Sequence, residues 1–103
     1  KQYSKALHEL ILARRKNPQD PEIVNLMGLT YLKSGKIYIA RAYFKKAINM
    51  NKNFAIAYNN LGAVYHLRKK YKKAIKYYKK AVEINPQYLL AYYNMANAYF
   101  ARK

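Results

Sequence analysis

The sequence predicts an all-α solenoid of about six helices, and three observations lead to this fold class. Residues of one kind recur at a spacing of 34, as Gly28 and Gly62 do and as Ala40 and Ala74 do. Apolar residues between the turns recur three and four positions apart, which is the helical period, and no segment alternates as a strand would. A fixed period of this length indicates one supersecondary unit stacked on itself, and such arrays usually present a binding surface.

Turn residues set the boundaries of the first helices in order along the chain. The first helix ends at Asn17-Pro18, because proline disfavours the helical conformation of the residue before it. Asp20-Pro21 begins the second helix, since it places an N-cap acceptor before a proline at the first helical position. Gly35 ends that helix, because glycine adopts the left-handed conformation of a helix end at little cost.

The later boundaries follow the same plan with one difference. The third helix ends at Asn51-Lys52 and the fifth at Asn85-Pro86, one and two periods after the first boundary. At the end of the fourth helix Lys69 stands where the period would place a glycine, so we expect this turn to be strained or differently shaped. The boundaries predict helices at about 1–16, 21–34, 37–50, 55–68, 71–84 and 89–102.

Small residues occupy the places where two helices are expected to meet. Gly28, Gly62 and Ala96 lie midway along alternate helices, and Ala40 and Ala74 lie early in the helices between them. Aromatic side chains one period apart then fill the space beside each close approach. This alternation of small and large residues predicts interlocking helices.

The composition limits the classes of function. The chain has a formal net charge of +17 and no cysteine. This charge would attract nucleic acid, anionic membranes or acidic proteins. The alternative is that the basic residues form a solvated face and that A/T-rich codons account for their number. No stretch of 18 apolar residues and no signal-peptide layout is present. The sequence leaves the compartment open, although the absence of cysteine and of a visible targeting signal favours the cytoplasm.

Candidate catalytic residues are few. His8 and His66 are the two histidines, Ser4 and Ser34 are the two serines, and the four acidic residues show no paired spacing. Acid–base, nucleophilic and metal sites each need a cluster of such groups. We therefore expect a chain that is not an enzyme and that binds no cofactor and no metal.

The repeat resembles the tetratricopeptide repeat (TPR) family. The residues that carry the resemblance are Tyr58, Leu61, Gly62, Tyr65, Ala74, Tyr78, Ala81 and Pro86. The resemblance implies a right-handed superhelix of antiparallel helix pairs, in which first helices line a concave groove and second helices lie on the convex side. It divides the chain, taken as one fragment of a longer TPR array, into a second helix at 1–20, full repeats at 21–54 and 55–88, and a first helix at 89–103.

The family's usual role is to bind a peptide segment of a partner protein in the concave groove. Carried over by repeat position, the groove residues are Asn25, Leu29, Asn59, Asn60, Ala63, His66, Tyr93, Asn94 and Asn97. Asn60 and Asn94 occupy the same position of consecutive copies, so their carboxamides resemble a ladder that holds a peptide backbone. The ladder is interrupted at Leu26, and the alternative interpretation is a merely polar, solvent-lining face.

A second binding mode of the family is not favoured by the residues at these positions. The clamp for the C-terminal carboxylate of chaperone tails requires cations and amides at set groove positions. This chain offers Asn25, Leu29, Asn60, Leu90 and Asn94 there, and only Asn60 matches. We therefore expect another class of peptide.

Basic residues gather on the second helices instead. The expected convex face carries Lys45, Lys46, Lys72, Lys73, Lys76, Lys79 and Lys80. An alternative function is therefore binding of an anionic partner, namely nucleic acid, an acidic protein or a membrane surface. A further alternative is a regulatory repeat segment of a larger enzyme.

The two terminal helices predict association. Leu89 and Leu90 in the last helix, and Leu7 and Leu10 in the first, have no following or preceding helix in the sequence to cover them. Because exposed apolar faces tend to be covered, we expect self-association end to end or capping by sequence outside the fragment.

Overall fold

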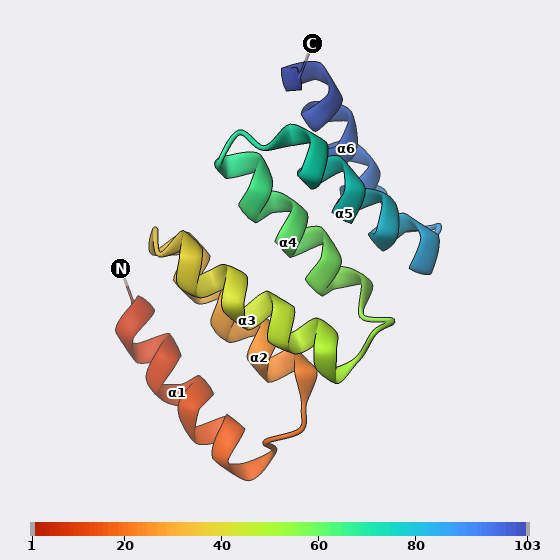
Figure 1. Ribbon diagram of the computed structural model, residues 1–103. Helices are drawn as coiled ribbons and strands as arrows, with labels where there is room; N and C mark the ends of the chain where they lie inside the picture. The colour runs from red at the N-terminus through yellow and green to blue at the C-terminus, as the bar shows by residue number, and fades with distance from the viewer. Residues whose placement is uncertain (1, 103) are drawn as a thin grey trace. The chain divides into compact units, whose positions relative to one another are not determined.

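The computed structural model describes residues 2–102, and it consists of six α-helices there with no strand. The prediction of an all-α repeat fold is confirmed. The helices, labelled in Figure 1, are α1 (Tyr3–Lys16), α2 (Pro21–Lys33), α3 (Ile37–Met50), α4 (Ala55–Leu67), α5 (Tyr71–Ile84) and α6 (Leu89–Arg102). None of these helices has the length and apolar character needed to cross a membrane.

The predicted helix starts and ends have identifiable causes in the structure. The Asp20 side chain accepts a hydrogen bond of 2.9 Å from the backbone N–H of Glu22, so it caps α2 as expected. Gly35 has a φ of 89°, and the N–H of Lys36 donates to the carbonyl of Tyr31 over 2.9 Å. This arrangement is a Schellman turn, which satisfies carbonyls left unpaired at the end of α2.

The turn without a glycine has the same hydrogen bonds as the turn with one. Lys69 has a φ of 61°, and the N–H of Lys70 donates to the carbonyl of Tyr65 over 2.8 Å. The conformation after α4 therefore matches that after α2, although a side chain in this region is sterically unfavourable. The turn is strained and not differently shaped.

The chain forms two compact units, each with its own core. In unit 1 (Lys1–Lys52) α2 packs against α1 and α3, and in unit 2 (Asn53–Lys103) α5 packs against α4 and α6. Val24, Met27, Ala40, Phe44 and Ala47 form the buried core of unit 1. The buried hydrophobic residues of unit 2 are Ala57, Tyr58, Leu61, Val64, Tyr65, Ala74, Ile75, Tyr78, Ala81, Ala91 and Ala98.

The small residues allow the close helix contacts that the sequence predicts. A Cβ atom added at Gly62 would lie 2.5 Å from Cε1 of Tyr78, and one added at Gly28 would lie 2.7 Å from Cε1 of Phe44. Real Cβ atoms essentially never approach another atom so closely. An aromatic ring on the next helix therefore occupies the volume that a larger residue would need. Burial of the Tyr78 side chain raises its pKa to about 12.

Stacked tyrosines join first and second helices in both units. The rings of Tyr31 and Tyr43 stack with centroids 5.3 Å apart, and those of Tyr65 and Tyr77 stack at 5.4 Å. Both pairs follow from the same repeat positions. The two units therefore use one packing scheme.

Candidate functional site

The first helices of unit 2 meet at a pair of amide side chains. Asn59 on α4 is only 3% exposed, and Nδ2 of Asn94 on α6 donates to its Oδ1 over 3.1 Å. A buried amide without a partner would be unfavourable, so this hydrogen bond stabilises the approach of α4 to α6. It also fixes the orientation of the Asn94 carboxamide.

Tyr88 supports Asn59 from the segment before α6. A side-chain hydrogen bond with Asn59 lowers the pKa of the Tyr88 hydroxyl, but burial is the larger effect and raises that pKa overall. Asn59 therefore interacts with one side chain from the segment before α6 and one from α6 itself. These three residues form a small polar network at the edge of the core.

We call the surface formed by Asn60, Ala63, His66, Asn94 and Asn97 the first-helix face of unit 2. Asn60, Ala63, His66 and Asn94 are half-buried there, whereas Asn97 is exposed. The His66 ring meets the edge of the Tyr71 ring at a centroid distance of 5.1 Å and an angle of 85°. His66 is therefore partly held by α5.

The other residues expected in the groove differ in their exposure. Tyr93 is 66% exposed on α6. In unit 1 Asn25 is buried at 5% exposure, and Leu29 is half-buried. Asn25 and Asn59, which occupy the same repeat position, thus lie within their units and have little accessible surface.

Tyr88 is a residue of this network that the sequence did not point to. Its equivalents one and two periods earlier are Phe54 and Asp20, so the repeat shows no consistent residue type at this position. One signal in the sequence could have indicated it: Tyr88 carries a hydroxyl where Phe54, one period earlier, has none, and this hydroxyl can bind an amide such as Asn59. Only the folded chain brings that hydroxyl to Asn59.

The lysines expected on the convex side are exposed in the structure. This holds for all members of the predicted set, which is Lys45, Lys46, Lys72, Lys73, Lys76, Lys79 and Lys80. Two of them lie over aromatic rings, Lys73 Nζ at 5.3 Å from the centroid of Tyr65 and Lys76 Nζ at 5.8 Å from that of Tyr77. Cation–π contacts of this kind orient a lysine without neutralising it.

Across residues 2–102 no three histidine or acidic side chains come together in a way that could hold a metal ion. The side chains of the first-helix face are amide, aliphatic and aromatic groups. Such groups recognise peptide units by hydrogen bonds and apolar contact.

Comparison with known proteins identifies relatives along the chain. A protein of Pyropia yezoensis, described as "Uncharacterized protein ycf37", is 34% identical over a match that covers 71% of this chain and 46% of that protein. The corresponding protein of Porphyra purpurea is 29% identical over 71% of this chain and 47% of its own length. The chain thus spans about half the length of the curated relatives that it matches.

Two solved structures and two family models also match the chain. The crystal structure of MamA superposes with a TM-score of 0.85 at 26% identity, over 97% of this chain and 55% of MamA. The first TPR of Spaghetti (RPAP3), solved with the HSP90 peptide SRMEEVD, has a TM-score of 0.88 at 21% identity, over 97% and 79% of the two chains. Tetratricopeptide repeat models match residues 21–54 and residues 55–88. The chain therefore belongs to the tetratricopeptide repeat family.

Proposed function

We propose that this chain is a non-enzymatic protein-interaction scaffold whose first-helix face binds an extended peptide segment of a partner protein. The observation that carries the proposal is the hydrogen bond from Asn94 to the buried Asn59. It uses one donor of the Asn94 amide, which as a carboxamide has a second N–H donor and an acceptor oxygen. These groups match the C=O and N–H of a peptide backbone.

Neighbouring residues extend the surface on which such a peptide would lie. Asn97 is one helical turn beyond Asn94, and Tyr93 beside it is 66% exposed. An exposed aromatic ring offers apolar contact to a peptide side chain at a low cost in conformational entropy. The amides thereby bind the backbone of the peptide, and the face has little selectivity for the side chains of the peptide.

The mode of binding differs from that of a carboxylate clamp. The Spaghetti domain was solved with a peptide that ends in Glu-Glu-Val-Asp. In this chain Leu29 and Leu90 stand at two of the positions that such a clamp requires to be polar or cationic. We therefore propose an internal, extended peptide segment as the ligand and not a free C-terminus.

The test begins with a peptide selected from a random peptide library on the 103-residue chain. The affinity of that peptide is then measured by fluorescence anisotropy, with and without N-methylation of its backbone at alternate residues. N-methylation removes hydrogen-bond donors and leaves the protein unchanged, so we expect about a fivefold loss of affinity or more for two lost hydrogen bonds of about 0.5–1.5 kcal/mol each. Alanine replacement of the peptide side chains should have smaller effects.

Variants locate the binding site. We expect Asn97→Ala alone, and more strongly Asn94→Ala with Asn97→Ala, to weaken the selected peptide. The matched control removes two exposed amides outside the helices, Gln19→Ala with Gln87→Ala. Because Asn94→Ala also leaves the buried Asn59 oxygen without its donor, thermal unfolding of each variant must show a folded chain. Equal affinity of the control and the Asn94/Asn97 variant would reject the proposal.

A further inference from the structure

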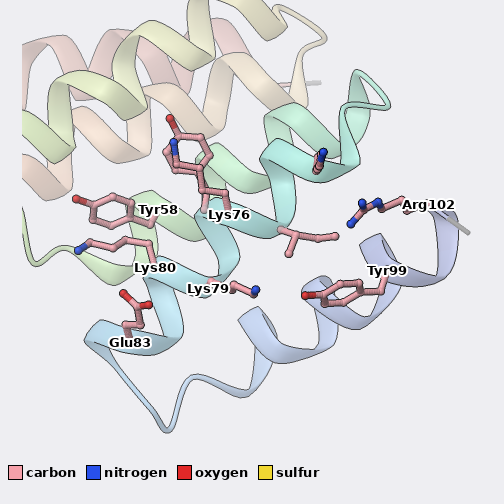
Figure 2. A pocket seen from close by; sticks show the side chains of 10 residues that line it. Tyr58, Lys76, Lys79, Lys80, Glu83, Tyr99 and Arg102 are labelled. Carbon is pink, nitrogen blue, oxygen red and sulfur yellow. The ribbon is translucent and has the colours of Figure 1, made fainter.

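A second candidate site lies over α5 in unit 2. A cavity of about 630 Å³ opens over the exposed face of this helix, and it is lined from α4, α5 and α6 of unit 2. Figure 2 shows Tyr58 and Lys80 on one side of α5, and Tyr99 and Arg102 on the other. We call this cavity the α5 hollow.

The lining of the α5 hollow is strongly cationic. Lys72, Lys76, Lys79 and Lys80 come from α5, and Arg102 comes from the end of α6. The spacing of the lysines, three, four and eight residues apart, places them on one helix face. Like charges at such spacings repel one another, so a bound anion relieves a repulsion already present in the free protein.

Tyrosines give the hollow walls that a bare charged helix lacks. Tyr58 is 9% exposed and Tyr99 is 47% exposed, and each flanks the lysine row from a different helix. The Tyr99 hydroxyl is turned toward Lys79 (Figure 2). Because a low-dielectric wall beside clustered cations concentrates their field, an anion in the hollow is attracted more strongly than one on an open surface. The tyrosine hydroxyls can also donate hydrogen bonds to a carboxylate.

The equivalent positions of unit 1 do not make the same site. Lys45 and Lys46 stand one period before Lys79 and Lys80. However, Tyr38 and Ala42 replace Lys72 and Lys76, and Val24 replaces Tyr58. The α5 hollow is therefore a property of one repeat and not of the basic composition as a whole.

Glu83 indicates which kind of anion fits. It lies in the lining at the C-terminal end of the lysine row, one helical turn beyond Lys79 and Lys80. A uniform polyanion such as nucleic acid would bring a phosphate against this carboxylate. A peptide can instead place a neutral or basic residue there, and its carboxylates can face the lysines. Complementarity along the whole row thus favours a peptide.

We propose that the α5 hollow binds a short acidic segment of a partner protein, with its carboxylates on the lysine row of α5 and its chain between Tyr58 and Tyr99. Lys72 and Lys80 are separated by about 12 Å along a helix axis, which corresponds to about four residues of an extended chain. This site is distinct from the first-helix face. The scaffold can thus bind two peptide segments at once. The first-helix face binds the backbone of one segment, and the α5 hollow binds the acidic side chains of the other.

The experiment uses a fluorescein-labelled peptide with four consecutive Glu residues followed by Lys and flanked by Gly and Ser, at physiological ionic strength. Its binding is measured by anisotropy to the 103-residue chain and to Lys79→Gln with Lys80→Gln. The matched control is Lys45→Gln with Lys46→Gln, which removes the same charge from the same repeat positions of α3. We expect about a tenfold loss or more for the α5 variant, and about twofold or less for the control, because charge-assisted contacts are lost only in the former.

Three outcomes would overturn the proposal. Equal losses in the two variants would mean attraction by net charge alone. If a single-stranded oligothymidylate binds more tightly than the acidic peptide and loses its binding only in the α5 variant, the hollow is a nucleic-acid site. If phosphatidylcholine–phosphatidylserine vesicles bind more tightly than the acidic peptide and lose their binding only in the α5 variant, the hollow is a membrane site.

A further variant separates this site from the proposed peptide-binding face. We expect Asn94→Ala with Asn97→Ala to bind the acidic peptide as the wild type does, because neither residue lines the hollow. Loss of acidic-peptide binding in this folded variant would show that the two proposals describe one site, and it would reject the separate site. All exchanged lysines are exposed, so circular dichroism should show unchanged helix content in the lysine variants.

Discussion

Lys69 shows how one residue departs from the repeat while the backbone follows it. Its φ of 61° is the left-handed conformation that Gly35 adopts one period earlier with a φ of 89°. The hydrogen bonds of the turn from Tyr65 to Lys70 are retained. The surrounding helix pair therefore imposes the conformation on a residue that disfavours it.

We expect Lys69→Gly to stabilise the chain by about 0.5–1 kcal/mol. The left-handed conformation costs a side-chain-bearing residue about 1–2 kcal/mol, and the greater flexibility of glycine in the unfolded state offsets part of the gain. Urea unfolding followed by circular dichroism measures the difference. Lys69→Ala removes the same charge but keeps a Cβ atom, so it should give little of this gain. Equal stabilisation by both variants would assign the effect to charge.

At the scale of the elements, the contact between α4 and α5 depends on the missing side chain of Gly62. The Tyr78 ring lies where a Cβ atom would be, and Tyr78 itself is only 2% exposed. Because the ring is enclosed, it cannot move aside without opening the helix pair. The repeated small residue is thus a steric requirement of the fold.

We expect Gly62→Ala to destabilise the chain by up to about 2 kcal/mol. Overpacking of a core costs about 1–3 kcal/mol, while alanine gains about 1 kcal/mol in helix propensity over glycine. The measurement is the free energy of unfolding in urea, repeated in a Tyr78→Leu background that removes the ring. There the same substitution should cost much less, and an unchanged cost would contradict the steric explanation.

At the scale of the whole molecule, charge and exposed apolar surface act in opposite directions. The net charge of +17 keeps copies apart, yet Leu89 and Phe100 on α6 are each 78% exposed and Tyr93 is 66% exposed. Contiguous apolar surface of this kind favours association. Salt screens the repulsion between charges and leaves the apolar attraction in place.

We therefore expect the 103-residue chain to self-associate, and to do so more strongly as the salt concentration rises. Static light scattering over a range of protein and salt concentrations measures the mass. Leu89→Gln with Phe100→Gln should remain monomeric under the same conditions, and Tyr38→Gln, on the exposed outer side of α3, serves as the control. A wild-type chain that stays monomeric at high salt and high concentration would refute the expectation.

The repeat, the helix boundaries to within one or two residues, and the exposure of the lysines could all be predicted from the amino-acid sequence. These features follow from local chemistry and from the spacing of small and aromatic residues, both of which are readable along the chain. The resemblance to the family rests on the same spacing, from Tyr58 to Pro86. The groove residues that it assigned remain predictions about binding.

Which of the predicted polar residues are accessible could not be predicted and is known from the folded chain. Asn59 and Asn60 are neighbours in sequence, yet Asn59 is buried and bound to Asn94 while Asn60 is half-buried. The α5 hollow likewise depends on Tyr58 and Tyr99, which no local pattern relates to each other. Burial and cavity shape are set by side chains from other helices, and the distances between such side chains exist only in the folded chain.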